Sequence, residues 1–451
     1  MQSRSGFLNS SKPAESVNPL IYPVRPMKAE LSRELTVAVV GAGGRGYHGY
    51  GKKYPGTMKI VAVADTNQFR LDRMANEWKV PENRRFHDYR ELLAASANGK
   101  LADILFVTLP DHLHYDAAMM GMELGYDVLV EKPMAQSLKE CLDMLAKQKE
   151  TGRIVGVCHV LRYAPYFEAM KYAIDRGLIG QLMSIQHSEL VDMIHMAHSY
   201  VRGDWRNSKI ATPMVMSKCC HDLDLINWFV GSRCSHVSAE GELRYFIPKN
   251  RPAGAPARCT DGCPHEKDCI YSAIKTYVKR RAWTWPLDLP PNATDEQVTK
   301  ILAASPYSRC VFACDNDQPE QYAAALRFEN GVSVAFSYEA LSHVEQRRTR
   351  VIGTKGMLEG DGHEFRLTDL ATGKYWDWSM QIQNIPGYER QGHGGGDYRL
   401  VRDFLQAVDK HDPSMLTSTL EASVESHLIG FACEESRLTG KKIKLHGKRK
   451  E

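Results

Sequence analysis

The sequence predicts an α/β protein with two unlike halves: a doubly wound parallel sheet over residues 35–157, and an antiparallel sheet with helices over residues 158–451. In the first half, short β-branched apolar runs alternate with helix-sized gaps, which is typical of a parallel sheet covered on both faces. In the second half, apolar residues alternate with period two around an Asn-Gly pair, which favours antiparallel hairpins. Residues 1–34 are rich in Ser, Pro and Asn, and we expect them to form an extension outside the first domain.

The composition describes a globular protein with neither a polyanion nor a membrane as partner. Hydrophobic residues make up 43% and charged residues 25% of the 451 positions, and the formal net charge is only +4. Because this charge is small for the size, we expect no nucleic-acid partner. No apolar run reaches the ~18 residues that a membrane span needs, and no secretory signal is recognisable. We therefore expect a cytoplasmic protein whose eleven cysteines are reduced thiols.

A glycine-rich loop follows the first predicted strand. The apolar run Leu35–Val40 leads into a segment with the spacing G-x-G-x-x-G. Gly41 permits a tight turn, Gly43 lets the backbone approach a pyrophosphate, and Gly46 allows the helix to pack closely on the strand. The N-terminus of that helix then faces the phosphates. The loop predicts a dinucleotide site in a Rossmann domain, with these cofactor contacts: Gly41, Gly43, Gly44, Arg45 and Gly46.

An acidic residue ends the second predicted strand. The run Lys59–Ala64 follows after a helix-sized gap and leads to Asp65. A carboxylate at this point accepts hydrogen bonds from the adenosine ribose hydroxyls and repels the 2′-phosphate of NADP. We therefore predict NAD as the cofactor. The nearby Arg70 keeps NADP open, and a helix-capping role is the alternative for Asp65.

Two further strands complete the same sheet. Ile104–Thr108 leads to the turn Leu109-Pro110-Asp111-His112, and Asp127–Val130 leads to Glu131-Lys132-Pro133. Ligands of open parallel sheets bind at the carboxyl ends of the strands. A functional residue falls at each of four such ends: Gly41, Asp65, Thr108 and Lys132. This convergence predicts one crevice for the cofactor and its substrate.

These motifs, in this order, resemble the Gfo/Idh/MocA family of sugar and cyclitol oxidoreductases. The resemblance covers about residues 35–440, and Glu131-Lys132-Pro133 is its most specific element. The other matching features are the glycine loop, the turn Thr108-Leu109-Pro110, His112, His114, Arg162-Tyr163 and His221-Asp222.

The resemblance implies a Rossmann domain followed by an α/β domain on a large, mostly antiparallel sheet, with the substrate between that sheet and the nicotinamide. It also implies a homo-oligomer, either a dimer or a tetramer. Lys132 would face the reacting hydroxyl, and His221 would be its proton-transfer partner. Many members place an Asp four residues before this His, whereas this chain has Ser217 there, followed by Lys218. The further cofactor contacts would be Thr108, Leu109, Pro110, His112, His114, Glu131, Lys132 and Arg162.

The second half contains a long strand and a clear hairpin. Gln181–Met193 is the long strand. The hairpin joins two runs of alternating apolar residues, Ala324–Phe328 and Val332–Phe336, through Asn330-Gly331. An Asn-Gly pair in this position favours a type I′ turn.

Two polar loops of the second half are predicted to contact the substrate. Trp205 and Arg206 belong to one loop, where an indole stacks on a sugar face while charged groups bind hydroxyls. A surface loop anchored by its Trp is an equally good interpretation. His393 opens a Gly-rich turn before a helix near Tyr398, and this turn either carries His393 to the substrate or is a flexible linker. The predicted substrate contacts are Tyr163, Trp205, Arg206, Lys218, Asp222 and His393.

Cysteines gather in an insertion near residues 247–316. Zinc needs four soft ligands in a closed tetrahedral arrangement, and the insertion holds five cysteines and His265. The spacing lacks a C-x2-C pair, so buried or partly exposed thiols are the alternative. A structural, non-catalytic zinc site is one of two predictions for this insertion, and its ligands would be Cys259, Cys263, Cys269 and Cys310, with Cys314 or His265 as substitutes.

Together these features predict an oxidoreductase that moves a hydride between NAD(P) and a hydroxyl carbon of a sugar, sugar derivative or cyclitol. The cofactor carries the redox chemistry, and the protein supplies orientation and a base. His221 suits this task because an imidazole exchanges protons near neutrality. One alternative is a redox-neutral NAD-dependent glycosidase that oxidises, eliminates, hydrates and re-reduces its substrate. Another is a catalytically silent NAD-binding sensor.

Overall fold

The computed structural model describes residues 17–25, 29–50, 58–385 and 392–446. Its first half is a parallel sheet with the strand order β3-β2-β1-β4-β5-β6. The strands are β1 (Leu35–Val40), β2 (Met58–Ala64), β3 (Arg85–Phe86), β4 (Ile104–Val107), β5 (Asp127–Val130) and β6 (Val155–Val157). The order reverses beside β1, as in doubly wound sheets. The predicted fold of this half is therefore confirmed.

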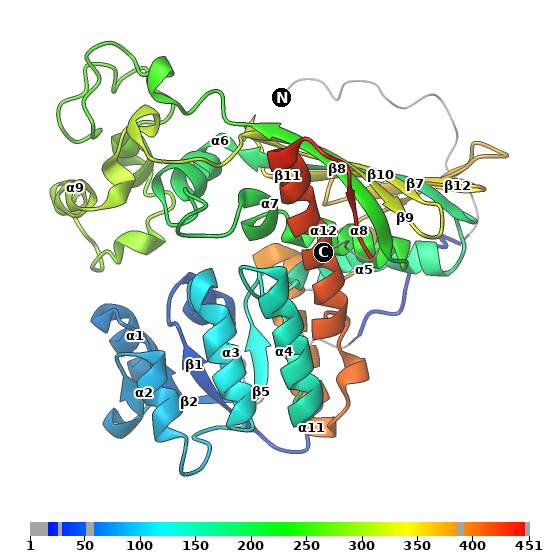
Figure 1. The fold of residues 1–451 in the computed structure, drawn as a ribbon, viewed down its shortest axis with the longest axis horizontal. Helices are drawn as coiled ribbons and strands as arrows, with labels where there is room; N and C mark the ends of the chain where they lie inside the picture. Colours follow the sequence, from blue (N-terminus) through cyan, green and yellow to red (C-terminus); the bar gives the residue numbers. More distant parts are fainter. Residues whose placement is uncertain (1–16, 26–28, 51–57, 386–391, 447–451) are drawn as a thin grey trace.

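Helices cover both faces of this sheet (Figure 1). The four that follow its strands are α1 (Gln68–Trp78), α2 (Tyr89–Ala95), α3 (His114–Glu123) and α4 (Leu138–Thr151). The cap of α4 is explicit in the sequence, because Ser137 and Glu140 form a capping box and Gly152 ends the helix at φ 65°. A helix from the far end of the chain, α11 (Gly396–Lys410), packs its apolar side against β1 and β4 through Leu400 and Phe404.

The second half is a nine-stranded sheet with the order β14-β13-β12-β11-β7-β10-β9-β8-β15. Only β7 and β10 pair in parallel, so the predicted mostly antiparallel sheet is confirmed. The strands are β7 (Leu182–Asp192), β8 (Cys234–Glu242), β9 (Gln321–Phe328), β10 (Ser333–Ser342), β11 (Gln346–Gly353), β12 (Gly356–Gly360), β13 (Phe365–Asp369), β14 (Tyr375–Trp378) and β15 (Ile443–Lys444).

One face of this sheet is covered by helices, as Figure 1 shows. The helices of this half are α5 (Pro165–Asp175), α6 (Met193–His195), α7 (Met214–Ser217), α8 (Cys220–Val230), α9 (Asp295–Ala304), α10 (Met380–Gln383) and α12 (Leu420–Thr439). The long helix α12 contacts β8 and α8 of this half and also α4 of the first half, so it ties the two sheets together. No helix in the described ranges is both long and apolar enough to cross a membrane.

The hairpin between β9 and β10 has the predicted strands but a different turn. A type I′ turn needs positive φ at both Asn330 and Gly331, and only Gly331 has it, at 89°. Phe328 pairs with Val332 through a 2.9 Å hydrogen bond, and Gly331 N donates to the Phe328 carbonyl oxygen. The loop therefore has three residues, with a left-handed glycine in its last position.

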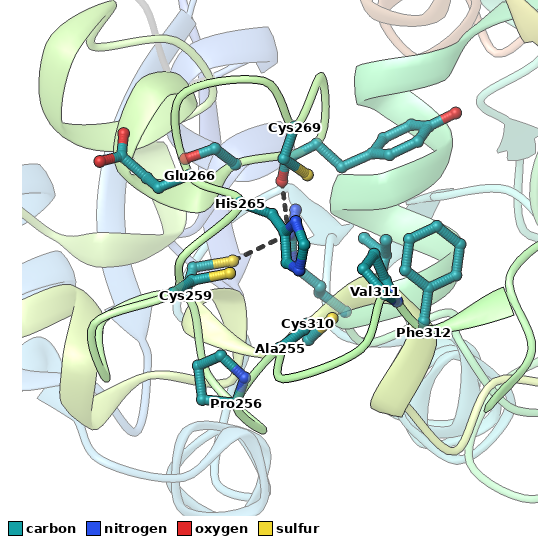
Figure 2. A pocket seen from close by; sticks show the side chains of 14 residues that line it. Ala255, Pro256, Cys259, His265, Glu266, Cys269, Cys310, Val311 and Phe312 are labelled. Atoms are coloured by element: carbon teal, nitrogen blue, oxygen red, sulfur yellow. Dashed lines mark hydrogen bonds between the residues drawn. The ribbon is translucent and has the colours of Figure 1, made fainter.

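The cysteine-rich insertion has its own small apolar core rather than a zinc centre. Ala273, Tyr277, Val278, Leu287, Val298, Leu302 and Tyr307 form that core. The four predicted zinc ligands do line one pocket with His265 (Figure 2). Over the described residues, however, no three His, Cys, Asp or Glu side chains are arranged to hold a metal ion. Cys259 is instead contacted by Arg202 Nη2 at 3.7 Å, and the zinc prediction is not supported.

The described part of the N-terminal extension packs against the second half. Leu20 and Tyr22 are buried in its core, and Tyr22 donates a 3.1 Å hydrogen bond to Glu168. Arg25 forms ion pairs with Glu168 at 3.2 Å and Asp403 at 2.7 Å. Residues 17–25 are therefore an integral part of the fold, whereas residues 1–16 and 26–28 of the predicted extension lie outside the described ranges.

Candidate active site

The glycine loop has the shape of a dinucleotide cradle. Gly41 has φ 94°, and a methyl group added to it would lie 2.4 Å from the Thr108 carbonyl oxygen. A methyl group on Gly46 would lie 1.9 Å from the Gly41 oxygen, so both positions exclude any side chain. A methyl group on Gly43 would meet only Arg70 Nη1, at 3.6 Å, which leaves this part of the loop open to a ligand. The loop therefore fits a bound pyrophosphate.

Asp65 braces this cradle. Its carboxylate accepts hydrogen bonds from the backbone N–H groups of Ala42 at 2.7 Å and Asn67 at 2.8 Å. Asn67, not Asp65, caps α1, because its side chain accepts from Arg70 N. Each carboxylate oxygen keeps a second lone pair, so Asp65 holds the loop and still has acceptor capacity for ribose hydroxyls.

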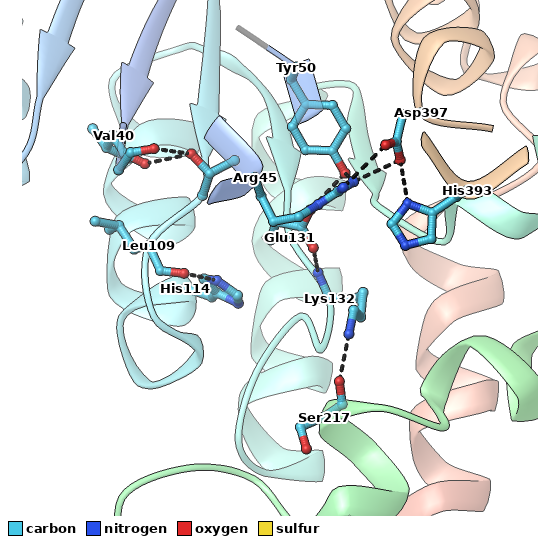
Figure 3. Close-up of polar contacts among 12 residues, drawn as sticks. Val40, Arg45, Tyr50, Leu109, His114, Glu131, Lys132, Ser217, His393 and Asp397 are labelled. Atoms are coloured by element: carbon cyan, nitrogen blue, oxygen red, sulfur yellow. Dashed lines mark hydrogen bonds and ion pairs between the residues drawn. The ribbon is translucent and has the colours of Figure 1, made fainter. Parts of the chain in front are cut away.

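Arg45, which is partly exposed, joins the buried Glu131 in an ion-pair network (Figure 3). Arg45 Nε donates to Glu131 at 2.7 Å, and its other nitrogens donate to Asp397 and to the Tyr50 hydroxyl. Burial opposes ionisation of Glu131, but Arg45 and Lys132 hold the pKa of its carboxyl below the usual value. The second Glu131 oxygen accepts the backbone N–H of Lys132 at 2.9 Å, so the network positions Lys132.

The turn after β4 is held by His114, which was predicted to contact the cofactor. Its two ring nitrogens lie 2.7 Å from the Leu109 oxygen and 2.8 Å from the Pro133 oxygen, so it joins the ends of β4 and β5. Thr108 donates to the Gly41 oxygen at 2.7 Å and joins β4 to the glycine loop. His112 is exposed beside them. The predicted residues thus gather at the strand ends, and His114 and Thr108 shape the crevice there.

Lys132 and His221 come together from the two halves of the chain. Lys132 Nζ donates a hydrogen bond to the Ser217 carbonyl oxygen at 2.5 Å (Figure 3). Ser217 is the last residue of α7, just before α8, the helix that carries His221. His221 is buried, and its Nδ1 has no hydrogen-bond partner among the described residues. The His393 ring lies 5.8 Å from the His221 ring, and His393 Nδ1 is 2.9 Å from Asp397.

Burial keeps His221 in its neutral form. It lowers the pKa of His221 well below the usual value, and the nearby Lys132 and His393 add to this effect. Two more buried imidazoles lie behind it: His159, 6.1 Å from His221 between ring centres, and His427, 5.6 Å from His159. Burial lowers the pKa of His159 to about 4 and that of His427 to about 3. The unprotonated imidazole has a lone pair that can accept a proton from a bound hydroxyl, and its lowered pKa makes it a weaker base than a free imidazole.

The buried His159 predicts a loss of stability in mild acid. The unfolded chain takes up a proton near pH 6.5, whereas the folded protein resists protonation until about pH 4. Stability is therefore lost as pH falls through this window. Neither ring nitrogen of His159 has a hydrogen-bond partner in the described ranges, although Nε2 lies 3.8 Å from Asp224. His159→Phe therefore removes no hydrogen bond and should recover about 2–3 kcal/mol of the loss between pH 7.5 and 4.5. Urea unfolding at both pH values measures this, with exposed His363→Phe as control. An unchanged pH dependence would contradict the assignment.

A charged cluster occupies the sheet surface beside Lys132 and His221. Lys218 Nζ lies 2.9 Å from Glu189 and also pairs with Glu345, while Arg347 lies 3.1 Å from Glu189. Burial opposes the charge on Lys218, but Glu189 and Glu345 raise the pKa of its amine above the usual value. Part of Lys218 and more of Glu345 remain exposed, so they present a donor and an acceptor side by side. Glu189, Glu345 and Arg347 carry no local sequence signal, because the pairing of β7 with β11 places Arg347 opposite Glu189 and Glu345 just before β11.

Five predicted contacts are buried or bonded to other partners. Arg162 donates to Asp224 through two nitrogens, at 2.6 and 2.7 Å, and to the Thr417 oxygen. The Tyr163 hydroxyl lies in the core, 2.9 Å from Ser418 Oγ. We therefore correct Arg162 from a cofactor contact to an internal brace, and Tyr163 from a substrate contact to a packing residue.

The other two corrections concern Asp222 and the loop with Trp205. Asp222 is wholly buried and bonds to Arg347 and His187; burial opposes its ionisation, but these partners lower its pKa to about 2. Asp222 is therefore a buried partner of the charged cluster, through its hydrogen bond with Arg347. Trp205 packs on the core of the second half and Arg206 pairs with Asp315 at 2.7 Å, which matches the anchored-loop interpretation.

Comparison with known proteins shows which family has this architecture. Residues 35–159 match the family model described as the Gfo/Idh/MocA oxidoreductase family, NAD-binding Rossmann fold. Residues 171–445 match the C-terminal alpha/beta domain of the same family. The Bacillus subtilis (strain 168) protein YteT, named as an oxidoreductase, is 26% identical over 73% of this chain and 78% of its own length. Inositol 2-dehydrogenase 1 of Saccharopolyspora erythraea is 29% identical, over 47% of this chain and 54% of its own length.

Solved structures share the fold at low identity. An inositol dehydrogenase homologue of Azotobacter vinelandii, complexed with NADH and myo-inositol, superimposes with a TM-score of 0.67 at 16% identity, over 93% of this chain and all of its own. Levoglucosan dehydrogenase, in complex with NADH and levoglucosan, gives 0.65 at 17% identity, over 92% of this chain and all of its own. With the second family model spanning more than half of its residues, the chain belongs to the Gfo/Idh/MocA family of oxidoreductases.

Proposed function

We propose that this protein transfers a hydride between NAD and a hydroxyl carbon of a cyclitol, sugar or sugar derivative. The observation that carries the proposal is the proximity of Lys132, at the carboxyl end of β5, to the buried imidazole of His221, whose Nδ1 has no hydrogen-bond partner among the described residues. The ends of parallel strands are where ligands of such sheets bind. A base and a hydrogen-bond donor at that edge suit proton removal from an alcohol.

The chain's own residues divide the work as follows. When bound, nicotinamide supplies the hydride acceptor. Lys132 Nζ is held by the Ser217 carbonyl and donates a hydrogen bond to the reacting hydroxyl oxygen. His221 is neutral, and it takes up the hydroxyl proton at a ring nitrogen. Burial around His221 excludes bulk water, so the proton stays within the site.

The charged cluster and the relatives support a polyhydroxylated substrate. Lys218 and Glu345 offer a donor and an acceptor at the surface of the sheet, and hydroxyl groups satisfy both kinds of partner. Several relatives are named as inositol dehydrogenases, and the solved neighbours bind myo-inositol or levoglucosan. A compact ring with several hydroxyls is therefore the substrate class that we propose.

Asp65 supports NAD over NADP. It lies at the end of β2, where the adenosine ribose is expected, and its carboxylate has acceptor capacity for the 2′-hydroxyl. A 2′-phosphate in the same place would meet a like charge. The same edge of the sheet therefore favours the unphosphorylated cofactor.

The function can be tested with a substrate panel that includes free inositols, aldoses, anhydrosugars and aryl glycosides. We expect one NADH for each molecule of a free polyol oxidised when NAD is added, and no release of aglycone from the glycosides. Nicotinamide released from the denatured protein gives the amount of cofactor carried through purification. Aglycone release without net NADH would replace the proposal by a redox-neutral glycosidase. NAD binding without turnover of any compound would favour a sensor.

A further inference from the structure

The cysteine-rich insertion of the second half reaches the nucleotide loop of the first half. In Figure 1 the insertion, with α9, lies on the same side of the molecule as α1. A methyl group on Gly44 would lie 3.5 Å from the Trp285 ring, so this indole rests against the glycine loop. The Trp285 side chain remains 40% exposed and so is not held there by burial in a core. It faces the part of the loop where a pyrophosphate is expected.

A second contact fixes the insertion to the adenosine end of the same loop. Asp288 forms an ion pair with Arg70, with Nη2 and Oδ2 2.9 Å apart, and also accepts from Arg70 Nε at 3.0 Å. The side chain of Asn67, the cap of α1, donates to Asp288 at 3.0 Å. Both partners follow Asp65 by a few residues. Asp288 therefore lies beside the position where the ribose 2′-group of a bound cofactor is expected.

The charge balance at this point is acidic. Asp288, Asp65 and Asp204 all act on Arg70: burial opposes its charge, but the three carboxylates raise the pKa of its guanidinium. An arginine after the second strand is the kind of residue that binds a 2′-phosphate. Here Nε and Nη2 of Arg70 are directed to Asp288, and Asp65 and Asp204 act on the same guanidinium. Arg73 is also close, since its Nη2 donates to the Ala42 oxygen at 3.2 Å, so three carboxylates face two guanidinium groups. A 2′-phosphate would therefore be repelled, whereas a 2′-hydroxyl carries no charge.

The backbone of the segment is unusual as well. Arg281, Trp283, Asp288 and Asn292 all have φ between 46° and 58°, the left-handed region that residues with side chains rarely adopt. Such conformations persist only where surrounding contacts enforce them, and they cluster at ligand clamps. Leu287, next to Asp288, is buried in the small apolar core of the insertion, which supplies that enforcement.

We propose that residues 281–288 form a cofactor clasp, in which Asp288 sets the preference for NAD by engaging Arg70 and Trp285 slows cofactor release by covering the glycine loop. The clasp rests on the proposed NAD-dependent function, and it gives the insertion a role that a metal site does not supply. Neither residue touches the reacting hydroxyl. Asp288 is a specificity residue, and Trp285 is a retention residue.

The role of Asp288 in cofactor preference is tested by measuring the affinities for NAD and NADP by calorimetry for wild type and Asp288→Asn. Freeing Arg70 should strengthen NADP binding about 10–100-fold and change NAD binding far less. The matched control is Asp268→Asn, which removes an exposed carboxylate of the same insertion outside residues 281–288. It should leave both affinities unchanged. If Asp288 has only a structural role, Asp288→Asn should change the affinities for NAD and NADP alike, and that result would overturn the clasp.

Two further variants test the roles of Arg70 and Trp285. Adding Arg70→Met to Asp288→Asn should abolish the gain in NADP affinity, since the freed guanidinium is the group that binds the 2′-phosphate; a gain that persists without Arg70 would contradict the proposal. Trp285→Ala should speed NADH release about tenfold, followed by stopped-flow fluorescence of the dihydronicotinamide. An unchanged release rate would remove the retention role. If wild type binds neither NAD nor NADP, the proposed function fails; if it binds NAD and the variants behave as wild type, only the clasp fails.

Discussion

Replacing Lys132 with methionine is expected to lower the turnover number by about 10²–10⁴-fold, the usual contribution of a group that acts in proton transfer. Methionine keeps the length of the side chain but removes the donor that now bonds to the Ser217 oxygen. NAD binding should persist, because the glycine loop and Asp65 are untouched by the change. Turnover is measured with the polyol oxidised by the wild type, and NAD affinity is measured by calorimetry.

The control for this variant is Lys139→Met, on α4. Lys139 is exposed and forms only an ion pair with Asp143, so turnover should remain that of the wild type. The double variant Lys132→Met/His221→Ala adds a second check. If the two residues act as one unit, the double variant should be little slower than the slower single variant. A Lys132→Met enzyme that keeps its full turnover would refute the assignment.

The strands β1, β2, β4 and β5 of the first sheet could be predicted because each is a local apolar run, whereas β3 and β6, with two and three residues, were not predicted. Leu35–Val40 and Asp127–Val130 are exact matches to β1 and β5, and the residues that follow them lie at the crevice as expected. A parallel strand buried on both faces must be apolar throughout, so short-range sequence suffices. The hairpin shows the limit of such local prediction. Asn330-Gly331 fits both a type I′ turn and a three-residue loop, and only the backbone angle of Asn330 distinguishes them.

Contacts between distant segments could not be predicted from local sequence. Asp397 meets Arg45 across 352 positions, and nothing local to either residue indicates the pair. Tyr163 was placed at the substrate because a motif names it, yet its hydroxyl faces Ser418 in the core. Asp288 reaches Arg70 from an insertion for which a zinc site was one of two predictions. In each case tertiary topology chooses the partner, and residue type alone leaves several partners open.

The pair Arg162–Asp224 should be the most sensitive ion pair for stability. Both side chains are buried, and two parallel hydrogen bonds of 2.6 and 2.7 Å join them. Arg162 also donates to the Thr417 oxygen, so the pair ties the start of the second half to the segment before α12. Asp224→Ala leaves a buried guanidinium without its counter-charge, which should cost about 3–5 kcal/mol.

Thermal and urea unfolding of Asp224→Ala measure this loss, and two comparisons isolate its cause. Asp315→Ala removes an exposed carboxylate that pairs with Arg206 and Arg309, and it should cost only about 0–1 kcal/mol for each pair. The double variant Arg162→Met/Asp224→Leu removes both charges, and it should regain much of the stability lost in Asp224→Ala, because no unpaired charge remains buried. A double variant as unstable as the single one would show that the hydrogen bond to Thr417 and local packing, rather than the charge pair, hold this junction together.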